Sequence, residues 1–371
     1  MTVNLRHAAG SLLVVGLAGT ELSGLERAWL KVIRPAGIIL FRRNIADPHQ
    51  TRALLADAAS LGASHSLRCV DIEGGAVDRL RDALAPMPSA QAVALAARNA
   101  GRQTLMREQG ELVARGVRAF GFNTTLAPVL DLALPISEKV MGTRSPAAKP
   151  EEVVAYAREF LAGLATHDVV GCGKHFPGLG GGTLDSHLET PAIQRTLRQL
   201  TRQDLIPYAA LRAELPMIMV SHAAYPRTPG RNVPASGSPF WITTILRKRI
   251  GYRGLIFSDD LEMGGILKCM SIEEATVTAI RAGMNLLEIC HSPELILRAF
   301  ESLLAEAERS AAFRKLLLAR SRQTFLQRKK LFVHQASRAL SPIEFESLRA
   351  RILRFNEAIS KHQLKQGATP A

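Results

Sequence analysis

Long apolar runs, paired cysteines and aromatic residues are all scarce in this chain of 371 residues. No apolar run reaches the roughly 18–20 residues that a membrane-spanning helix needs, so no membrane span is predicted. The apolar and charged fractions are those of an ordinary globular protein, which rules out a disulfide scaffold, and the four cysteines show neither a CxxC nor a zinc-type spacing. With two Trp and four Tyr, the chain has few rings on which nucleic-acid bases could stack. The composition is that of a globular protein with a sizeable core.

The positions of the cysteines favour a reducing compartment. Cys69, Cys172 and Cys290 lie in or beside apolar, strand-like segments, where a reduced thiol behaves as a small hydrophobic side chain. We therefore expect a cytoplasmic protein. The early segment AAGSLLVVGLAG has the form of a short signal peptide, which leaves secretion as an alternative, although the same residues also suit a first strand.

Positive charge is abundant but unevenly distributed. The formal net charge is +14, and residues 301–371 contribute 14 Lys and Arg against six Glu and no Asp. Apolar residues recur there at helical spacing between the basic ones. This pattern predicts a basic helical C-terminal extension over residues 301–371, with a solvated charged face, after a first domain over residues 1–300. Nucleic-acid or membrane-surface binding by the extension is the alternative, although no nucleic-acid-binding motif is present.

Short apolar runs alternate with amphipathic helical patterns along the first 300 residues. The runs cover residues 11–17, 37–41, 67–72, 123–132, 169–176, 216–222, 254–259 and 284–290. Continuous apolar strands that alternate with helices are typical of a parallel sheet covered on both faces. Eight such units predict an α/β fold, a (β/α)8 TIM-type barrel with a C-terminal helical extension. A dinucleotide-binding sheet is disfavoured because no GxGxxG follows the first run.

Polar residues follow the predicted strands at one end. In an alternating barrel, the carboxyl ends of all strands meet at the face that carries active sites. The polar residues at these ends are Asp71, Glu73, Asp131, Lys174, His175, His222, Asp259 and Asp260. The sequence therefore predicts a single site at this barrel mouth.

The densest cluster is GKHFPGLGGGTLDSHLETP, residues 173–191. Lys174 and His175 end the fifth predicted strand, and a glycine-rich loop leads on to Asp185 and His187. In an extended loop these two side chains share one side, so the carboxylate can orient the imidazole for acid–base work. The alternative is that Asp185 only caps a turn.

Two further clusters contain carboxylates. In FSDDLEMGG, residues 257–265, strand alternation sends Asp259 and Asp260 to opposite sides, so we expect Asp259 to face the mouth and Asp260 to cap the following helix. In CVDIEGGAVDRL, residues 69–80, Asp71 and Glu73 share one side of one strand end. They would flank one side of a ligand, which favours binding roles over an acid–nucleophile pair.

These segments resemble the successive motifs of glycoside hydrolase family 3, and within it the short bacterial β-N-acetylglucosaminidases that act on peptidoglycan fragments. The resemblance runs from about residue 10 to residue 292. The motifs that carry it are LAGTEL, ILFRRN, VDIEGGAVDR, LAPVLDL, MGTRSP, GKHFPGLG with DSH, VSHAAYP and IFSDDLEM.

The resemblance implies a retaining exo-glycosidase that removes terminal β-linked N-acetylglucosamine from muropeptides or related oligosaccharides. Asp259 would be the nucleophile, His187 the general acid/base and Asp185 its orienting partner. The residues implied to hold the sugar hydroxyls are Asp71, Arg79, Arg144, Lys174 and His175. No cofactor and no metal are implied, and the small carbohydrate is the only partner implied.

Four departures from the family pattern accompany the resemblance. Leu179 stands where many relatives have a second histidine, and Ala76 replaces a common arginine. Asn285 replaces an aspartate at the start of the eighth strand, and the loop from Lys174 to His187 is about two residues longer. None of them removes Asp259 or the DSH triplet.

Alternatives to this interpretation remain at the level of the sequence. One is a family 3 β-glycosidase of other sugar specificity. Another is a metal-dependent barrel hydrolase built from His175, His187, His222 and Asp259, which the missing HxH after the first strand disfavours. A third is a non-catalytic sugar- or nucleic-acid-binding protein that uses the basic extension.

Overall fold

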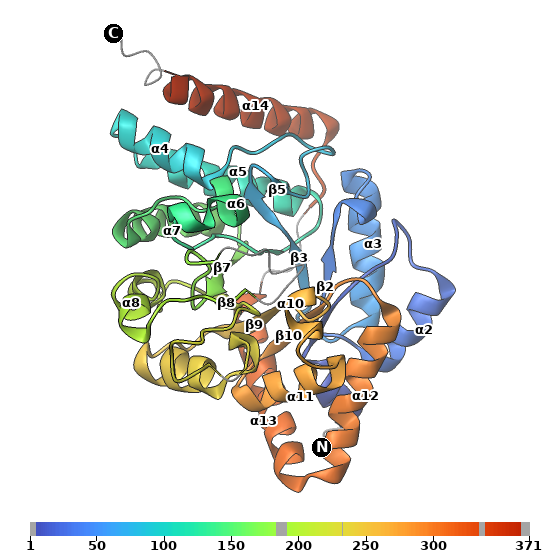
Figure 1. The fold of residues 1–371 in the computed structure, drawn as a ribbon. Coiled ribbons are helices and arrows are strands. Elements are labelled where there is room, and N and C mark those ends of the chain that lie inside the picture. Colours follow the sequence, from blue (N-terminus) through green and yellow to red (C-terminus); the bar gives the residue numbers. More distant parts are fainter. Residues whose placement is uncertain (1–4, 183–190, 232, 334–337, 365–371) are drawn as a thin grey trace.

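The computed structural model describes residues 5–182, 191–231, 233–333 and 338–364. Within them, eight parallel strands close into a barrel in the order β1-β10-β9-β8-β7-β6-β3-β2 (Figure 1). The strands are β1 (Leu13–Gly16), β2 (Gly37–Leu40), β3 (Leu67–Val70), β6 (Thr124–Thr125), β7 (Val170–Phe176), β8 (Met217–Val220), β9 (Leu255–Asp260) and β10 (Leu286–Ile289). The predicted (β/α)8 barrel is confirmed, and each predicted run contains the strand expected of it, except that β9 extends one residue beyond its run, to Asp260.

Helices follow the strands and cover the outside of the barrel. Several begin at side-chain caps, as where the Ser23 hydroxyl accepts from the Glu26 amide and the Glu26 carboxylate accepts from the Ser23 amide. The helices up to α11 are α1 (Leu5–Gly10), α2 (Gly24–Ile33), α3 (Pro48–Leu61), α4 (Ala90–Ala100), α5 (Thr104–Ala119), α6 (Glu138–Met141), α7 (Pro150–Ala165), α8 (Leu197–Arg202), α9 (Ile206–Ala210), the helix Phe240–Arg249, α10 (Gly264–Leu267) and α11 (Ile272–Ala282).

A second hydrophobic cluster fills the barrel interior, separate from the larger cluster between strands and helices. Alternate residues of the strands contribute to it, among them Val14, Ile39, Cys69 and Phe257. Because both faces of the strands are buried, the sequence shows continuous apolar runs rather than alternation. Above this cluster, toward the carboxyl ends of the strands, the interior becomes polar.

Three helices complete the described chain: α12 (Pro293–Arg309), α13 (Ala311–Leu331) and α14 (Pro342–Leu364). Phe332, directly after α13, joins the cluster inside the barrel. The Arg328 guanidinium, 1% exposed, donates to the Ala36 carbonyl at 2.9 Å, just before β2. Arg328 therefore departs from the predicted solvated face, because it satisfies main-chain groups at the amino-terminal end of the barrel.

Helix α14 packs against α4 and α5 on the outside of the molecule (Figure 1). Its apolar face is buried there at Leu348, Ile352 and Ile359. Helix α12 runs across residue 300, and the division of the chain at that residue stays a prediction. Among the described residues, no helix combines the length and apolarity that crossing a bilayer requires.

Candidate functional site

Four charged side chains interlock on one side of the barrel mouth. Asp71 directly follows β3, and Glu73 lies in β4 (Ile72–Gly74), a strand that pairs with β5 (Val77–Asp78). The Lys174 ammonium, from β7, lies 2.7 Å from Asp71 Oδ1 and 2.6 Å from Glu73 Oε1. Arg144 donates through Nε and Nη2 to the two Glu73 oxygens at 2.7 and 2.9 Å. Glu73 therefore joins two cations from separate parts of the chain, one in β7 and one in the turn Gly142–Arg144.

The charges of this group stabilise one another. Burial alone would raise the pKa of Glu73, but Arg144 and Lys174 hold that pKa well below its usual value. Burial would lower the pKa of Lys174, but Asp71 and Glu73 raise it above the ordinary lysine value. Glu73 and Lys174 are thus both charged at neutral pH. Unused donors remain for a ligand, since Lys174 has three N–H bonds and these carboxylates take two.

His175 is oriented by a carboxylate from the neighbouring β6 loop. Its Nδ1 lies 2.7 Å from Asp131 Oδ2, and the backbone amide of His175 donates to the same oxygen at 3.1 Å. Asp131 Oδ1 accepts from the Leu179 amide at 2.6 Å, so one buried carboxylate holds both the ring and the following loop. The Nε2 atom of His175 lies 3.3 Å from Arg144 Nη2.

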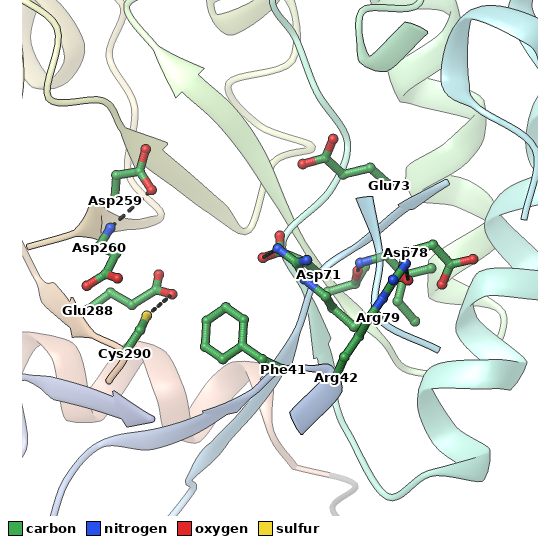
Figure 2. A network of polar contacts seen from close by, with 12 residues as sticks. Phe41, Arg42, Asp71, Glu73, Asp78, Arg79, Asp259, Asp260, Glu288 and Cys290 are labelled. Atoms are coloured by element: carbon green, nitrogen blue, oxygen red, sulfur yellow. Dashed lines mark hydrogen bonds and ion pairs between the residues drawn. The ribbon is translucent and has the colours of Figure 1, made fainter. Parts of the chain in front are cut away.

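Arg79 lies at the edge of this group. Its Nη2 atom is 4.0 Å from Asp71 Oδ2, and its guanidinium lies over the Phe41 ring at 5.6 Å. Figure 2 shows Arg79 and Asp71 on the side of the site away from Asp259. The five residues predicted to bind sugar therefore lie together: Asp71, Arg79, Arg144, Lys174 and His175.

Gly178 shows why the KHFPG segment carries a glycine. Its φ is +135°, and a Cβ atom there would lie 2.8 Å from Asp204 Cβ. Asp204 is buried and pairs with Arg195 Nε at 3.1 Å. Burial raises the pKa of Asp204 to about 6, although Arg195 opposes the shift.

Asp259 occupies the opposite side of the mouth, near the end of β9 (Figure 2). Its Oδ1 accepts from the Asp260 amide at 3.0 Å. Burial would raise its pKa, but His175, His222 and Lys174 favour the carboxylate, and the pKa lies below the usual aspartate value. Asp259 is therefore ionised at neutral pH, in the electrostatic reach of the cations across the mouth.

His222, which follows β8, has both ring nitrogens in use. Nδ1 lies 2.7 Å from the Ser236 hydroxyl, and Nε2 lies 2.9 Å from the Asp260 carbonyl oxygen. A neutral ring satisfies both contacts, with Nε2–H as donor, and burial lowers the His222 pKa accordingly. This arrangement speaks against the metal-dependent hydrolase, which needs a free nitrogen on His222.

Further acidic groups lie beside Asp259. Asp260 Oδ1 accepts from the Glu262 amide at 3.0 Å, which forms a turn ahead of α10. The predicted capping of a helix by Asp260 is thus wrong by position, because the helix begins only at Gly264. Glu288, inside the barrel on β10, accepts from the Cys290 thiol at 3.1 Å. Burial, with Asp260 nearby, raises the pKa of Glu288 well above its usual value.

Two residues at the site exceed what sequence reasoning assigned. Glu73 was expected to share a ligand-binding role with Asp71, and Asp131 was placed at the barrel mouth without a role, but neither was expected to hold other side chains of the site in place. Their spacing from Asp71 and their place at a strand end were the available indications.

Asp185 and His187, predicted as the acid–base pair, lie outside the described residues. Asn285 has a structural role, because its Oδ1 accepts from Arg247 at 2.6 Å and from the Ile256 amide at 3.0 Å.

Comparison with known proteins agrees with this geometry. The model of the glycosyl hydrolase family 3 N-terminal domain matches residues 5–316. The chain belongs to glycosyl hydrolase family 3. The expectation of a glycoside hydrolase is thereby confirmed.

Individual family 3 relatives cover most of the chain. A β-hexosaminidase of Methylococcus capsulatus is 41% identical over 288 residues, which are 77% of this chain and 85% of the relative. The structure of NagZ from Neisseria gonorrhoeae with N-trifluoroacetyl-D-glucosamine is 27% identical, with a TM-score of 0.74, and covers 94% of this chain and 98% of that one. A family 3 β-N-acetylglucosaminidase from a Paenibacillus species is 29% identical, with a TM-score of 0.85, and covers 96% of this chain and 69% of that one.

Proposed function

We propose that this family 3 chain is a retaining exo-glycosidase that removes terminal, non-reducing β-linked N-acetylglucosamine. Its substrates would be muropeptides or related oligosaccharides, cleaved in the cytoplasm during wall recycling. The β-hexosaminidase names of relatives that are up to 41% identical support the sugar specificity. The placement of an ionised Asp259 across the mouth from the Asp71–Glu73–Arg144–Lys174 group carries the proposal.

In the first step, Asp259 attacks the anomeric carbon as the glycosidic bond breaks. Because Oδ1 already accepts from the Asp260 amide, Oδ2 is the attacking oxygen. The leaving oxygen takes a proton from His187, and a covalent glycosyl-enzyme remains. In the second step, His187 removes a proton from water, which attacks the same carbon and releases Asp259. Two inversions give net retention.

The opposite side of the mouth would hold the sugar ring. Lys174 and Arg144 each keep donors that Glu73 and Asp71 do not use, and Asp71 Oδ2 lies toward Arg79 with acceptor capacity left. Charged donors and acceptors of this kind bind hydroxyls strongly. Because these cations are paired with carboxylates, they add little net attraction for an anionic aglycone. The muropeptide assignment therefore depends on the resemblance of the sequence motifs and not on local charge.

The decisive assay compares an aryl β-N-acetylglucosaminide with the matched aryl β-glucoside. We expect kcat/KM to favour the N-acetyl sugar by at least about 100-fold, which corresponds to about 3 kcal/mol. Proton NMR of early product should show the β-anomer. Equal turnover of the two sugars would favour the family 3 β-glycosidase of other specificity.

Further experiments distinguish hydrolysis from phosphorolysis, from a metal-dependent hydrolase and from a binding protein. Inorganic phosphate in the assay distinguishes phosphorolysis, which would yield the sugar 1-phosphate, from hydrolysis. Loss of turnover in a chelator, restored by Zn²⁺, would overturn the mechanism in favour of the metal-dependent hydrolase. Absence of any turnover, together with RNA or DNA binding that is lost on truncation after residue 300, would indicate a binding protein.

A further inference from the structure

Four potential metal ligands gather where β9 and β10 end, beside the nucleophile but outside the mechanism. Asp260 ends β9, Glu288 lies in β10, and Cys290 and His291 follow it. Figure 2 shows Asp260, Glu288 and Cys290 grouped on the Asp259 side of the site. Donor atoms of Asp260, Cys290 and His291 all lie within 4.8 Å of one another. Together they offer oxygen, sulfur and nitrogen.

Glu288 supplies an independent indication. The residue is 3% exposed, and its Oε1 accepts from the Cys290 thiol at 3.1 Å. Its Oε2 is buried and has no hydrogen-bond partner among the residues that the structure describes. A buried carboxylate oxygen without a partner is costly, and such groups usually have a partner or bind a metal. This oxygen belongs to a side chain already in contact with the cluster.

Among the described residues, no Lys or Arg forms an ion pair with Asp260 or Glu288. Arg43 donates through Nη2 to the Cys290 carbonyl at 2.7 Å and through Nε to the Leu17 carbonyl at 3.1 Å. His291 Nδ1 lies 3.5 Å from Asp260 Oδ2 and 3.3 Å from Glu262 Oε2. Its ring also lies 5.3 Å from the Phe41 ring.

The backbone that carries Cys290 and His291 is held in place. The Glu262 carboxylate accepts from the Cys290 amide at 2.7 Å, from the Ser292 amide at 2.7 Å, and from the His291 amide. One carboxylate thus fixes three successive residues, as second-shell groups do in metal sites. Such preorganisation reduces the ordering that binding must impose.

We propose that Asp260, Cys290 and His291, with Glu288 as the fourth donor, bind a divalent cation of the zinc class. Thiolate and imidazole select borderline-soft ions over Mg²⁺ and Ca²⁺, which prefer oxygen ligands. Tetrahedral zinc places its ligand atoms about 3.4–3.8 Å apart, given bonds of about 2.0–2.3 Å. The contacts of 3.1 Å (Cys290–Glu288) and 3.5 Å (His291–Asp260) are close to that spacing. Binding releases the Cys290 proton, and the exposed His291 ring turns to complete the set.

The test is direct metal binding by the full chain after treatment with a chelator. Titration with Zn²⁺ in a calorimeter should give one saturable site per chain. Replacement by Co²⁺ should give a thiolate-to-cobalt charge-transfer absorption, which reports the sulfur ligand. We expect C290S to abolish that absorption and H291N to weaken Zn²⁺ binding at least about tenfold.

Matched variants keep the result interpretable. C269S changes an exposed cysteine outside the cluster and should bind Zn²⁺ as the wild type does. H291N changes an exposed side chain, so it tests the proposal even where C290S fails to fold. Retention of the site in H187N separates it from the alternative metal set at His175, His187, His222 and Asp259. Absence of saturable binding, full binding by H291N, or loss of binding in H187N alone would overturn the proposal.

Discussion

On the β3–β7 side of the barrel mouth, Asp71 and Glu73 contact Lys174 and Arg144 directly. On the β9–β10 side, Glu288 contacts a thiol, and its Oε2 atom has no hydrogen-bond partner among the described residues. On the first side, each carboxylate already contacts a cation without any ligand. The second side lacks such compensation, and burial with Asp260 nearby raises the pKa of Glu288 well above its usual value. Under the two proposals above, the compensated side binds the sugar, while the other side carries the nucleophile and the cation site. Figure 2 shows the two groups facing one another across the site.

The largest expected effect tests whether the two sides divide binding from chemistry. D259N removes the proposed nucleophile and should lower kcat on the order of 10⁴-fold or more, with little change in inhibitor binding. D71N, the matched change on the other side, should chiefly raise KM for the aryl N-acetylglucosaminide. Steady-state kinetics with both variants measures the contrast. Equal losses of kcat with unchanged KM in the two variants would contradict the assignment of binding to one side and chemistry to the other.

The second prediction concerns His187, the proposed general acid/base. H187A should lose about 10²–10⁴-fold in kcat for a substrate with a poor leaving group, the usual share of general acid–base catalysis. The loss should shrink for nitrophenyl leaving groups, which need little protonation. H167A is the matched control, because His167 precedes β7 at the opposite end of the barrel. A uniform loss across leaving groups would contradict the assignment.

The barrel could be predicted from the sequence because each strand is a continuous apolar run that is buried on both faces. The strand-end rule also brought Asp71, Lys174, His175 and Asp259 to one mouth. The pairing of Glu73 with Arg144 could not be predicted, since their contact depends on where the β4–β5 hairpin and the Gly142–Arg144 turn meet in space. Arg328 was misjudged for a related reason. A basic residue in a basic helix gives no sign that it faces main-chain carbonyls.

Two matched Glu-to-Gln substitutions, one on each side of the mouth, test how far each carboxylate is compensated by neighbouring cations. E73Q leaves Arg144 and Lys174 buried with less negative charge, so the free energy of unfolding should fall by about 3–5 kcal/mol. E288Q removes a carboxylate with no cationic partner among the described side chains. In chelator-treated protein it should leave stability unchanged or raise it by about 1 kcal/mol. Urea unfolding of both variants provides the measurement. Similar losses in the two would show that both sides are equally compensated.

Asp204, which lies beside Gly178 after β7, is a buried carboxylate whose cationic partner compensates it only in part. Burial raises its pKa to about 6, although Arg195 Nε lies 3.1 Å from its Oδ2. Its ordinary value is about 3.9, so between these pH values the folded chain binds more protons than the unfolded one. The free energy of unfolding should therefore fall as pH rises from about 4 to 6, by roughly 1–3 kcal/mol, and then stay level. D204N lacks this titration, so relative to wild type it should gain stability by that amount over the same interval. Paired urea titrations from pH 4 to pH 8 measure the difference, and a difference that is constant with pH would show that the Arg195 ion pair compensates Asp204 fully.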